Sequence, residues 1–409
     1  MDIDLADLDF WRRPLKERHE AFARLRQLDH PVFFPEKKVP LLRSGTGFYA
    51  LVRHADVVEA SRNARVFSSE PAVTNPEPPG WVKHVFGESM VNMDDPRHAR
   101  LRRIVSRAFS PRMLQNLQAD IEQACARIVD DVLAKGPGDF VTQVAARLPI
   151  HVICDMMGIP ERMRAKVHEH VDASTAYSGV RPSVLQSARL AGKNVVALLA
   201  LQRMVIRLGH ERVADPGGDL VSALVTANPD GERLTDKELG SFFVLLLVAG
   251  NETARNTMAH GIKLLTDHPA QRELLMSDFD GHINAAIEEM VRHVSPIIQF
   301  RRTVTEDYSL RGLELKKGDR VVLFYGSANR DEEVFPDADA FDITRDTKPH
   351  VGFGGPGPHF CLGANLARQE MRTMFRELLT RLPGIRSVGE PELLVSNFDN
   401  SVRSQSFTF

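Results

Sequence analysis

Four glycines and two prolines precede a single cysteine in the stretch Val351-Gly-Phe-Gly-Gly-Pro-Gly-Pro-His-Phe-Cys361-Leu-Gly-Ala-Asn-Leu-Ala-Arg368. Residues 362–379 have helical periodicity, so Cys361 is expected on a tight loop at the N-terminus of a helix. The free N–H groups and the dipole of that helix would favour a thiolate. A buried free cysteine on a structural loop would explain the same pattern. The rest of the chain has to decide between the two interpretations.

Length and composition indicate a globular protein. The chain has 409 residues, is 43% hydrophobic and 26% charged, and carries a formal net charge of −2, which gives no indication of nucleic acid binding. Three scattered cysteines are too few for a disulfide framework and favour a reducing cytoplasm. The acidic N-terminus lacks a signal-peptide pattern, and the longest apolar run, 242–249, is too short to span a bilayer. We therefore expect a cytoplasmic protein without a membrane anchor.

Helical periodicity dominates the middle of the chain, and short strands are expected near both ends. The predicted helices cover residues 97–108, 111–135, 148–157, 161–173, 182–208, 220–226 and 236–267. The predicted strands cover residues 47–52, 304–315 and 320–325. The sequence contains no internal repeat and no linker long enough to separate domains. These features predict a single domain over residues 1–409 that is mainly α with a minor β portion.

The long central helix carries polar residues where only apolar ones are expected. A capping box predicts that this helix begins at residue 236, and its first half is apolar on all faces. Asn251, Glu252 and Thr253 then follow within the same segment. They either mark the point where the helix emerges into solvent, or form a carboxylate–alcohol pair that handles protons at a buried site. In the second case the small residues Ala249-Gly250 allow a ligand to lie against the helix.

Two further pairs have helical spacing. Glu289 and Arg292 are three residues apart, and His98 and Arg102 are four apart, so each pair shares one face of a predicted helix. Taken singly, such pairs are common on protein surfaces and indicate little.

In their order along the chain, these motifs resemble those of the cytochrome P450 heme-thiolate monooxygenases. The matching motifs are Ala249-Gly-Asn-Glu252-Thr253, Glu289-x-x-Arg292 and Gly355-x-Gly357-x-His359-x-Cys361-x-Gly363. The resemblance extends over nearly the whole chain. It implies a triangular, mostly helical domain that binds heme b between the central helix and the helix after Cys361.

The resemblance also implies a role for each matched residue. Cys361 would be the axial thiolate ligand of the iron, whose electron donation favours O–O cleavage. Thr253 would order a water at the iron-bound oxygen, Glu252 would be the acid of a proton relay, and Glu289 and Arg292 would be a structural pair. The residues that would contact the heme are, at its propionates, His98, Arg102, Arg302 and His359, and elsewhere Ala249, Gly250, Phe353, Gly354 and Gly363.

Two positions depart from the family pattern. Many members have an aromatic residue seven positions before the cysteine, where this chain has Gly354, with Phe353 one position further back. The arginine that usually completes the network of Glu289 and Arg292 is expected in the segment 335–341, where this chain has Ala340. A different group is therefore expected to complete that network.

The activity implied by the resemblance is hydroxylation of a C–H bond with O2 and two electrons. Because the heme domain uses the whole chain, the electrons would come from NAD(P)H through a separate ferredoxin reductase and ferredoxin. Two alternatives remain open, a peroxide-driven peroxygenase of the same fold and a non-catalytic heme- or lipid-binding protein. The arginines that we expect to form a dock for an acidic ferredoxin are Arg97, Arg100, Arg103, Arg107, Arg112, Arg368, Arg372 and Arg376.

The expected substrate pocket is mostly apolar, which favours an apolar substrate over a sugar or an acid. The residues expected to line it are Trp81, Val82, Val85, Phe86, Leu245, Val248, Ile297, Ile298 and Phe398. The residues of these motifs are similar to those of actinobacterial members that act on sterols, terpenoids or methyl-branched lipids. We expect a small-to-medium apolar substrate of one of these kinds.

Overall fold

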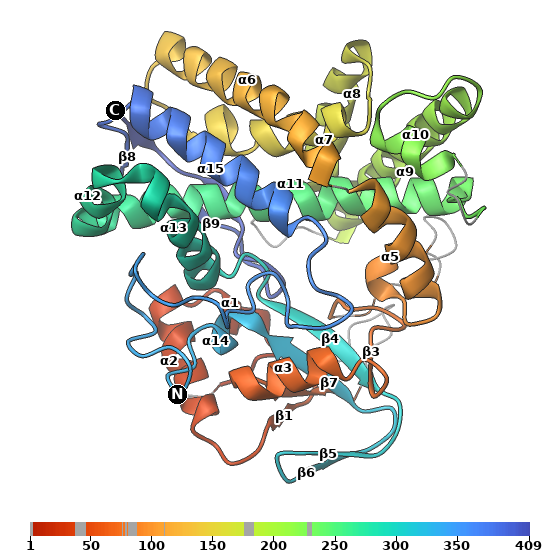
Figure 1. The fold of residues 1–409 in the computed structure, drawn as a ribbon. Coiled ribbons are helices and arrows are strands. Elements are labelled where there is room, and N and C mark those ends of the chain that lie inside the picture. The colour runs from red at the N-terminus through yellow and green to blue at the C-terminus, as the bar shows by residue number, and fades with distance from the viewer. Residues whose placement is uncertain are drawn as a thin grey trace.

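The computed structural model describes residues 3–36, 46–75, 77, 80, 88–109, 111–175, 184–226 and 231–409. Figure 1 shows a larger part made of helices and a smaller part that contains the main sheet and the first helices. The helices of the larger part are α5 (Arg97–Ala108), α6 (Pro111–Lys135), α7 (Arg147–Met156), α8 (Glu161–Thr175), α9 (Val184–Ala214), α10 (Leu220–Val225), α11 (Asp236–Asp267), α12 (Pro269–Ser277), α13 (Phe279–Val294) and α15 (Ala364–Arg381). The predicted fold class, mainly α with a minor β portion, is confirmed.

The helices α5, α6 and α11 begin and end at the predicted residues. The capping box at the start of α11 forms, because Thr235 Oγ1 accepts the Glu238 N–H and Glu238 Oε2 accepts the Thr235 N–H over 2.8 Å. The helix ends at Asp267, and His268 caps it directly before Pro269. Although α11 is 32 residues long, neither it nor another helix in the described ranges is long and apolar enough to cross a membrane. In contrast, α9 extends to Ala214, beyond its predicted end.

The main sheet joins strands from both ends of the chain. Its five strands, in spatial order, are β1 (Val32–Phe34), β2 (Phe48–Leu51), β7 (Arg320–Phe324), β4 (Gln299–Val304) and β3 (Phe67–Ser68). The pair β2–β7 is parallel and the other pairs are antiparallel. Three small pairs lie outside it, β5 (Tyr308–Leu310) with β6 (Leu313–Leu315), β8 (Arg386–Ser387) with β11 (Phe407–Thr408), and β9 (Glu392–Leu393) with β10 (Val402–Ser404).

The predicted strand at 304–315 is divided into two strands in the structure. The chain leaves the main sheet where β4 ends at Val304, and β5 and β6 form a separate hairpin. Arg311 and Gly312 reverse the chain between them with φ of +49° and +75°. Two arginines interrupt the apolar pattern of β4, so its sequence does not predict a strand.

Aromatic side chains attach the first helices, α1 (Leu8–Trp11) and α2 (Leu15–Arg26), to the main sheet. The Trp11 ring stacks on Phe324 of β7 with centroids 6.2 Å apart, and the Phe22 ring lies 5.1 Å from the same residue. A separate, larger apolar core fills the space among α6, α7, α9, α11, α13 and α15. The helices α3 (His54–Arg62) and α14 (Tyr325–Ala328) connect the sheet to the segments that follow it.

A fully buried ion pair on α13 organises the segment that precedes the cysteine. Glu289 and Arg292 are both 0% exposed, and Arg292 Nε donates to Glu289 Oε2 over 2.7 Å. Arg292 Nη2 donates to Glu289 Oε1 over 2.8 Å, and Nη1 donates to the carbonyls of Asn329 and Ala338, 2.7 and 2.8 Å away. Every partner of Arg292 is thus a group that accepts hydrogen bonds, as a buried cation requires.

The arginine of this network was expected in the segment 335–341, and the structure places it just beyond that segment, at Arg345. Arg345 Nε lies 3.4 Å from Glu289 Oε1, and Arg345 Nη2 donates to the Asp337 carbonyl over 2.9 Å. Ala340 itself contributes only its carbonyl, which accepts a hydrogen bond from Arg292 over 3.2 Å. The chain turns back after residue 337, and this turn brings Arg345 to the place where the sequence suggested a gap.

Removing one member of this pair should destabilise the protein strongly. Glu289→Ala leaves the buried Arg292 cation without its carboxylate, which we expect to lower the free energy of unfolding by about 3–5 kcal/mol. Urea denaturation followed by circular dichroism measures the loss. The matched control is Glu392→Ala, whose carboxylate is 56% exposed and pairs with Arg403 over 3.1 Å. An exposed pair contributes about 1 kcal/mol or less, so equal losses in the two variants would contradict this interpretation.

Candidate active site

The cysteine loop, residues 351–363, leads into α15 and is shaped by its glycines. Gly354 adopts a φ of +89°, in the left-handed region that favours glycine, and its N–H donates to the Val351 carbonyl over 3.0 Å. Gly357 passes so close to α3 that a Cβ atom there would lie 2.2 Å from the carbonyl oxygen of Ser61. A side chain at either position would displace the loop.

Cys361 is held at the end of this loop, directly before α15. Its N–H donates to the carbonyl of Phe353 over 2.9 Å, so the two residues are joined across the loop. Cys361 is exposed to solvent. Nevertheless, the surrounding protein desolvates the sulfur and raises the pKa of the thiol, an effect that the Gly363 N–H and the charges of Arg102 and Arg368 oppose. The loop thus presents an accessible sulfur beside a hydrogen-bond donor and two cations.

The four residues predicted to bind the propionates come together from three parts of the chain. His98 of α5 is 2% exposed, and its ring centroid lies 4.1 Å from that of His359 in the cysteine loop. Burial, and then the charges of Arg302, His98 and Arg102, lower the pKa of His359 to about 3. Arg102 Nη2 also donates to the Phe360 carbonyl over 2.7 Å. This crowding of basic groups indicates a site built for an anion.

The middle of α11 has accessible positions, and five of them form one stripe along the helix. Leu245, Val248, Ala249, Glu252 and Thr253 follow the spacing of one helix face, and none of the five is buried. Val248 is 42% exposed although it lies in the middle of this central helix. The stripe changes along its length from apolar to polar.

The polar end of the stripe lies inside the protein. Asn251 is 2% exposed, so the interpretation that the helix emerges into solvent there is wrong. Glu252 pairs with Arg255 over 2.6 Å, and both side chains are only 13% exposed. Thr253 Oγ1 donates to the Ala249 carbonyl over 2.8 Å. The absent side chain of Gly250 makes room for α7, because a Cβ atom there would lie 3.1 Å from Ile153.

The predicted substrate-pocket residues are only partly brought together. Trp81, Val82, Val85 and Phe86 lie outside the described residues. Ile298 is 5% exposed and belongs to the core beneath the sheet, so its assignment to the pocket is wrong. Neighbouring residues of an extended chain point to opposite sides, so Ile297 points away from the core that holds Ile298. Ile297 is half-buried. Phe398 is half-buried, and its ring centroid lies 5.7 Å from that of Phe300.

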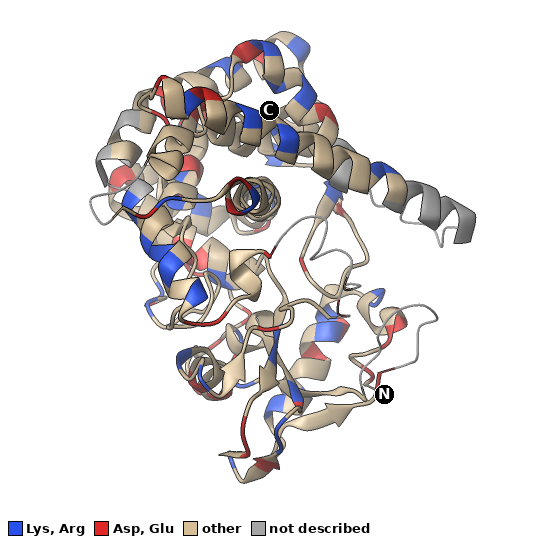
Figure 2. Cartoon of the chain, turned by 90° about the vertical axis from the view of Figure 1, so that its right-hand side faces the viewer, with Lys and Arg blue, Asp and Glu red and all other residues tan. Residues whose placement is uncertain are grey.

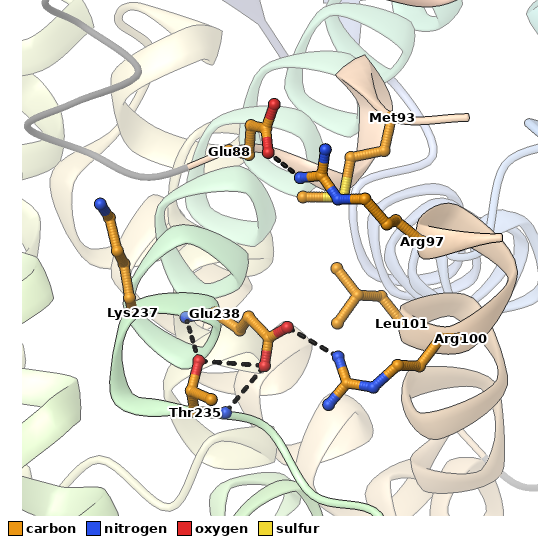
Figure 3. Close-up of a pocket in the computed structure, with 8 residues that line it drawn as sticks. All are labelled: Glu88, Met93, Arg97, Arg100, Leu101, Thr235, Lys237 and Glu238. Carbon is orange, nitrogen blue, oxygen red and sulfur yellow. Dashed lines mark hydrogen bonds and ion pairs between the residues drawn. The ribbon is translucent and has the colours of Figure 1, made fainter. Parts of the chain in front are cut away.

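A separate surface pocket of about 300 Å³ lies between α5 and the start of α11 (Figure 3). Two ion pairs frame it, Arg97 with Glu88, and Arg100 with Glu238 over 2.7 Å. The remaining residues that line it are Met93, Leu101, Thr235 and Lys237. The pair of Arg100 with Glu238 joins α5, which carries His98 and Arg102, to the start of the central helix.

The arginines expected to form a basic dock are largely paired with carboxylates. Arg103 pairs with Glu232 over 2.8 Å, and Arg368 donates two hydrogen bonds to Glu288. Figure 2, which views the molecule from the right-hand side of Figure 1, shows acidic residues interspersed among the basic ones. The side chain of Arg112 lies outside the described part of the chain. The described arginines therefore make a mixed surface rather than a uniformly basic one.

Comparisons with known proteins identify the family. The sequence model of the Cytochrome P450 family matches residues 200–383. The methyl-branched lipid omega-hydroxylase of Mycobacterium tuberculosis is 41% identical over 411 residues, which cover 100% of this chain and 95% of that protein. The chain belongs to the cytochrome P450 family. This P450 is therefore a monooxygenase with a heme-thiolate iron cofactor, and it acts on apolar substrates with electrons from redox partners.

Two further comparisons agree with this assignment. The steroid C26-monooxygenase of Mycolicibacterium smegmatis is 37% identical to this P450, over 87% of this chain and 82% of that protein. Among solved structures, a Mycobacterium marinum cytochrome P450 in complex with pseudoionone superposes with a TM-score of 0.91 and is 40% identical, covering 100% of this chain and 99% of that one.

The buried guanidinium of Arg302 shows that the site fits a heme. Arg302 is 4% exposed, and its partners are the Arg301 carbonyl, 2.8 Å away, and the hydroxyl of Tyr325. Within the described residues, no carboxylate forms an ion pair with it. Burial lowers the pKa of this guanidinium, and the propionates of a heme would supply the anion that stabilises its charge. The residues that would hold the group are Cys361 at the iron and His98, Arg102, Arg302 and His359 at the propionates.

Two ion pairs that shape this site were missed from the sequence, Glu252 with Arg255 and Glu288 with Arg368. Arg255 could have been found, because it lies three residues after Glu252 on the same helix. The pair of Glu288 with Arg368 could not, since 80 residues separate its members.

Removing the Arg302 cation should weaken retention of the heme. Hydrogen bonds to charged groups contribute about 1.5–3 kcal/mol, so we expect Arg302→Met to lose heme roughly tenfold faster. Transfer to a heme-free acceptor protein measures the rate. The matched control is Arg301→Met, a neighbour on β4 that points the other way and lies 3.6 Å from Glu77. Equal loss from both variants would contradict the assignment of Arg302 to the propionates.

Proposed function

We propose that this P450 hydroxylates the apolar chain of a methyl-branched lipid or a sterol. All 409 residues form one heme domain, which works in the cytoplasm and receives electrons from NAD(P)H through a ferredoxin reductase and a ferredoxin. The observation that carries the proposal is the accessible stripe of α11, in which the apolar Leu245 and Val248 lead to the polar Glu252 and Thr253. The similarity to a methyl-branched lipid omega-hydroxylase and a steroid C26-monooxygenase supports the substrate class.

The accessible stripe separates two tasks along one helix face. Leu245 and Val248 offer apolar surface to a hydrocarbon chain, which gains free energy by leaving water. When bound, the heme iron supplies the binding and reductive activation of O2, and its thiolate ligand favours O–O cleavage. Glu252 and Thr253 handle the protons that this chemistry consumes.

The contacts of Glu252 and Thr253, at the polar end of the α11 stripe, indicate which side chain must move during proton transfer. The Thr253 hydroxyl gives its proton to the Ala249 carbonyl, so its oxygen is free to accept a hydrogen bond from a water. Arg255 holds the Glu252 carboxylate by its charge. We infer that Glu252 takes up a proton after leaving Arg255 and passes it toward Thr253 through water.

Turnover with and without peroxide tests this function. We expect hydroxylated product from methyl-branched lipids or sterols with O2, ferredoxin, reductase and NADPH, and at least tenfold slower product formation with hydrogen peroxide alone. Equal rates would favour the peroxygenase alternative. If none of these lipids displaced the iron-bound water or was hydroxylated, a non-catalytic binding protein would be favoured.

Loss of the Thr253 hydroxyl should divert electrons from product. We expect Thr253→Ala to lower the product formed per NADPH consumed several-fold, because the water that delivers protons loses its partner. The matched control is Thr257→Ala, one turn further along α11, whose hydroxyl makes the same kind of bond, to the Thr253 carbonyl over 2.8 Å. Unchanged coupling in Thr253→Ala, or the same loss in both variants, would contradict the assigned role.

A further inference from the structure

Two arginines of α15 make the same kind of contact with two different phenylalanines. Arg368 Cζ lies 4.4 Å from the ring centroid of Phe353, and Arg376 Cζ lies 4.7 Å from that of Phe279. Each arginine also pairs with a carboxylate of α13, Arg368 with Glu288 and Arg376 with Asp280. The two arrangements differ in what the aromatic ring adjoins, since Phe353 belongs to the cysteine loop and Phe279 begins α13.

Glu288 is the centre of the arrangement at the cysteine loop. Arg368 Nε and Nη2 both donate to its carboxylate, the latter over 3.0 Å, and His350 Nε2 lies 2.9 Å from Glu288 Oε2. The other nitrogen of that imidazole, Nδ1, accepts the Gly352 N–H over 3.0 Å. Burial is the largest single effect on the pKa of Glu288 and raises it. The hydrogen bonds and charges of His350 and Arg368 together outweigh burial and lower the pKa to about 2. The carboxylate is therefore ionised and holds the guanidinium in place.

The guanidinium is in turn coupled to Cys361 in two ways. Arg368 lies over the ring of Phe353, whose carbonyl accepts the Cys361 N–H over 2.9 Å. Because Phe353 and Cys361 are joined by that hydrogen bond, the same contact also brings the positive charge of Arg368 toward the cysteine. Arg376 has no such link, because Phe279 and Asp280 are both on α13.

We propose that Glu288 and Arg368 are positioning residues for the thiolate ligand, which clamp Phe353 against the cysteine loop and set the reduction potential of the heme iron. The inference rests on the proposed role of Cys361 as that ligand. A cation near the thiolate stabilises the extra negative charge of the ferrous state, and Glu288 moderates this effect. The clamp also explains how Phe353 is fixed although Gly354 occupies the usual aromatic position.

Redox titration of the holoenzyme tests the proposal. We expect Arg368→Gln to lower the ratio of ferrous to ferric heme at a fixed potential at least threefold. For a one-electron couple this is a fall of about 28 mV in the reduction potential. Arg376→Gln, the matched control, removes the same kinds of contact from the same two helices and should leave the ratio unchanged. Glu288→Gln retains Arg368 without its counter-charge and should raise the ratio.

Two further readouts separate charge from clamping. Arg368→Lys keeps the charge but not the planar group over Phe353. We therefore expect it to have a reduction potential close to that of the wild type. The Soret band of its ferrous–CO complex should nevertheless be shifted from the wild-type position, as in Arg368→Gln. If Arg368→Gln does not fold, the rise in Glu288→Gln still decides the question. Unshifted potentials in both variants, or equal shifts in Arg368→Gln and Arg376→Gln, would overturn the inference alone. A wild-type protein without a thiolate-type ferrous–CO band would overturn the proposed function, and this inference with it.

Discussion

Two consecutive glutamates of α13 hold the cysteine loop between them. Glu289 is fully buried and holds Arg292 and Arg345, and thereby the segment that turns back after residue 337. Glu288 holds Arg368 of α15 and His350, at the two ends of the cysteine loop. A buried charge without a partner is costly, so Glu289 and Arg292, which are both fully buried, depend on each other. The position of Cys361 depends on both glutamates.

The central helix completes the site from the other side. Its capping box fixes where α11 begins, and its length carries it through the protein to a Pro-initiated α12. Because side chains recur on one face every three or four residues, Leu245, Val248, Glu252 and Thr253 share one accessible stripe. One helix face thus provides both apolar surface and proton-handling groups. The buried basic groups from α5, β4 and the cysteine loop provide the charge that an anionic heme needs.

Sequence reasoning found what local patterns encode. Capping and periodicity predicted α5, α6 and α11 with their ends, and the glycines and prolines before Cys361 marked the tight loop. It missed β4, whose arginines break the apolar pattern. It also assigned Ile298 to the pocket, although that side chain packs in the apolar core between the main sheet and the first helices. The pairs of Glu288 with Arg368 and of Glu289 with Arg345 were also missed. Their members lie 80 and 56 residues apart, and only folding of the intervening chain brings them together.

The central claim is that the accessible cysteine of this P450 ligates the heme iron. The absorption spectrum of the reduced protein with carbon monoxide tests it most directly. We expect a long-wavelength Soret band typical of a thiolate ligand, lost in Cys361→Ser and retained in Cys154→Ser, whose thiol is buried in the core. A band typical of histidine ligation in the wild type, or an unchanged band in Cys361→Ser, would contradict it.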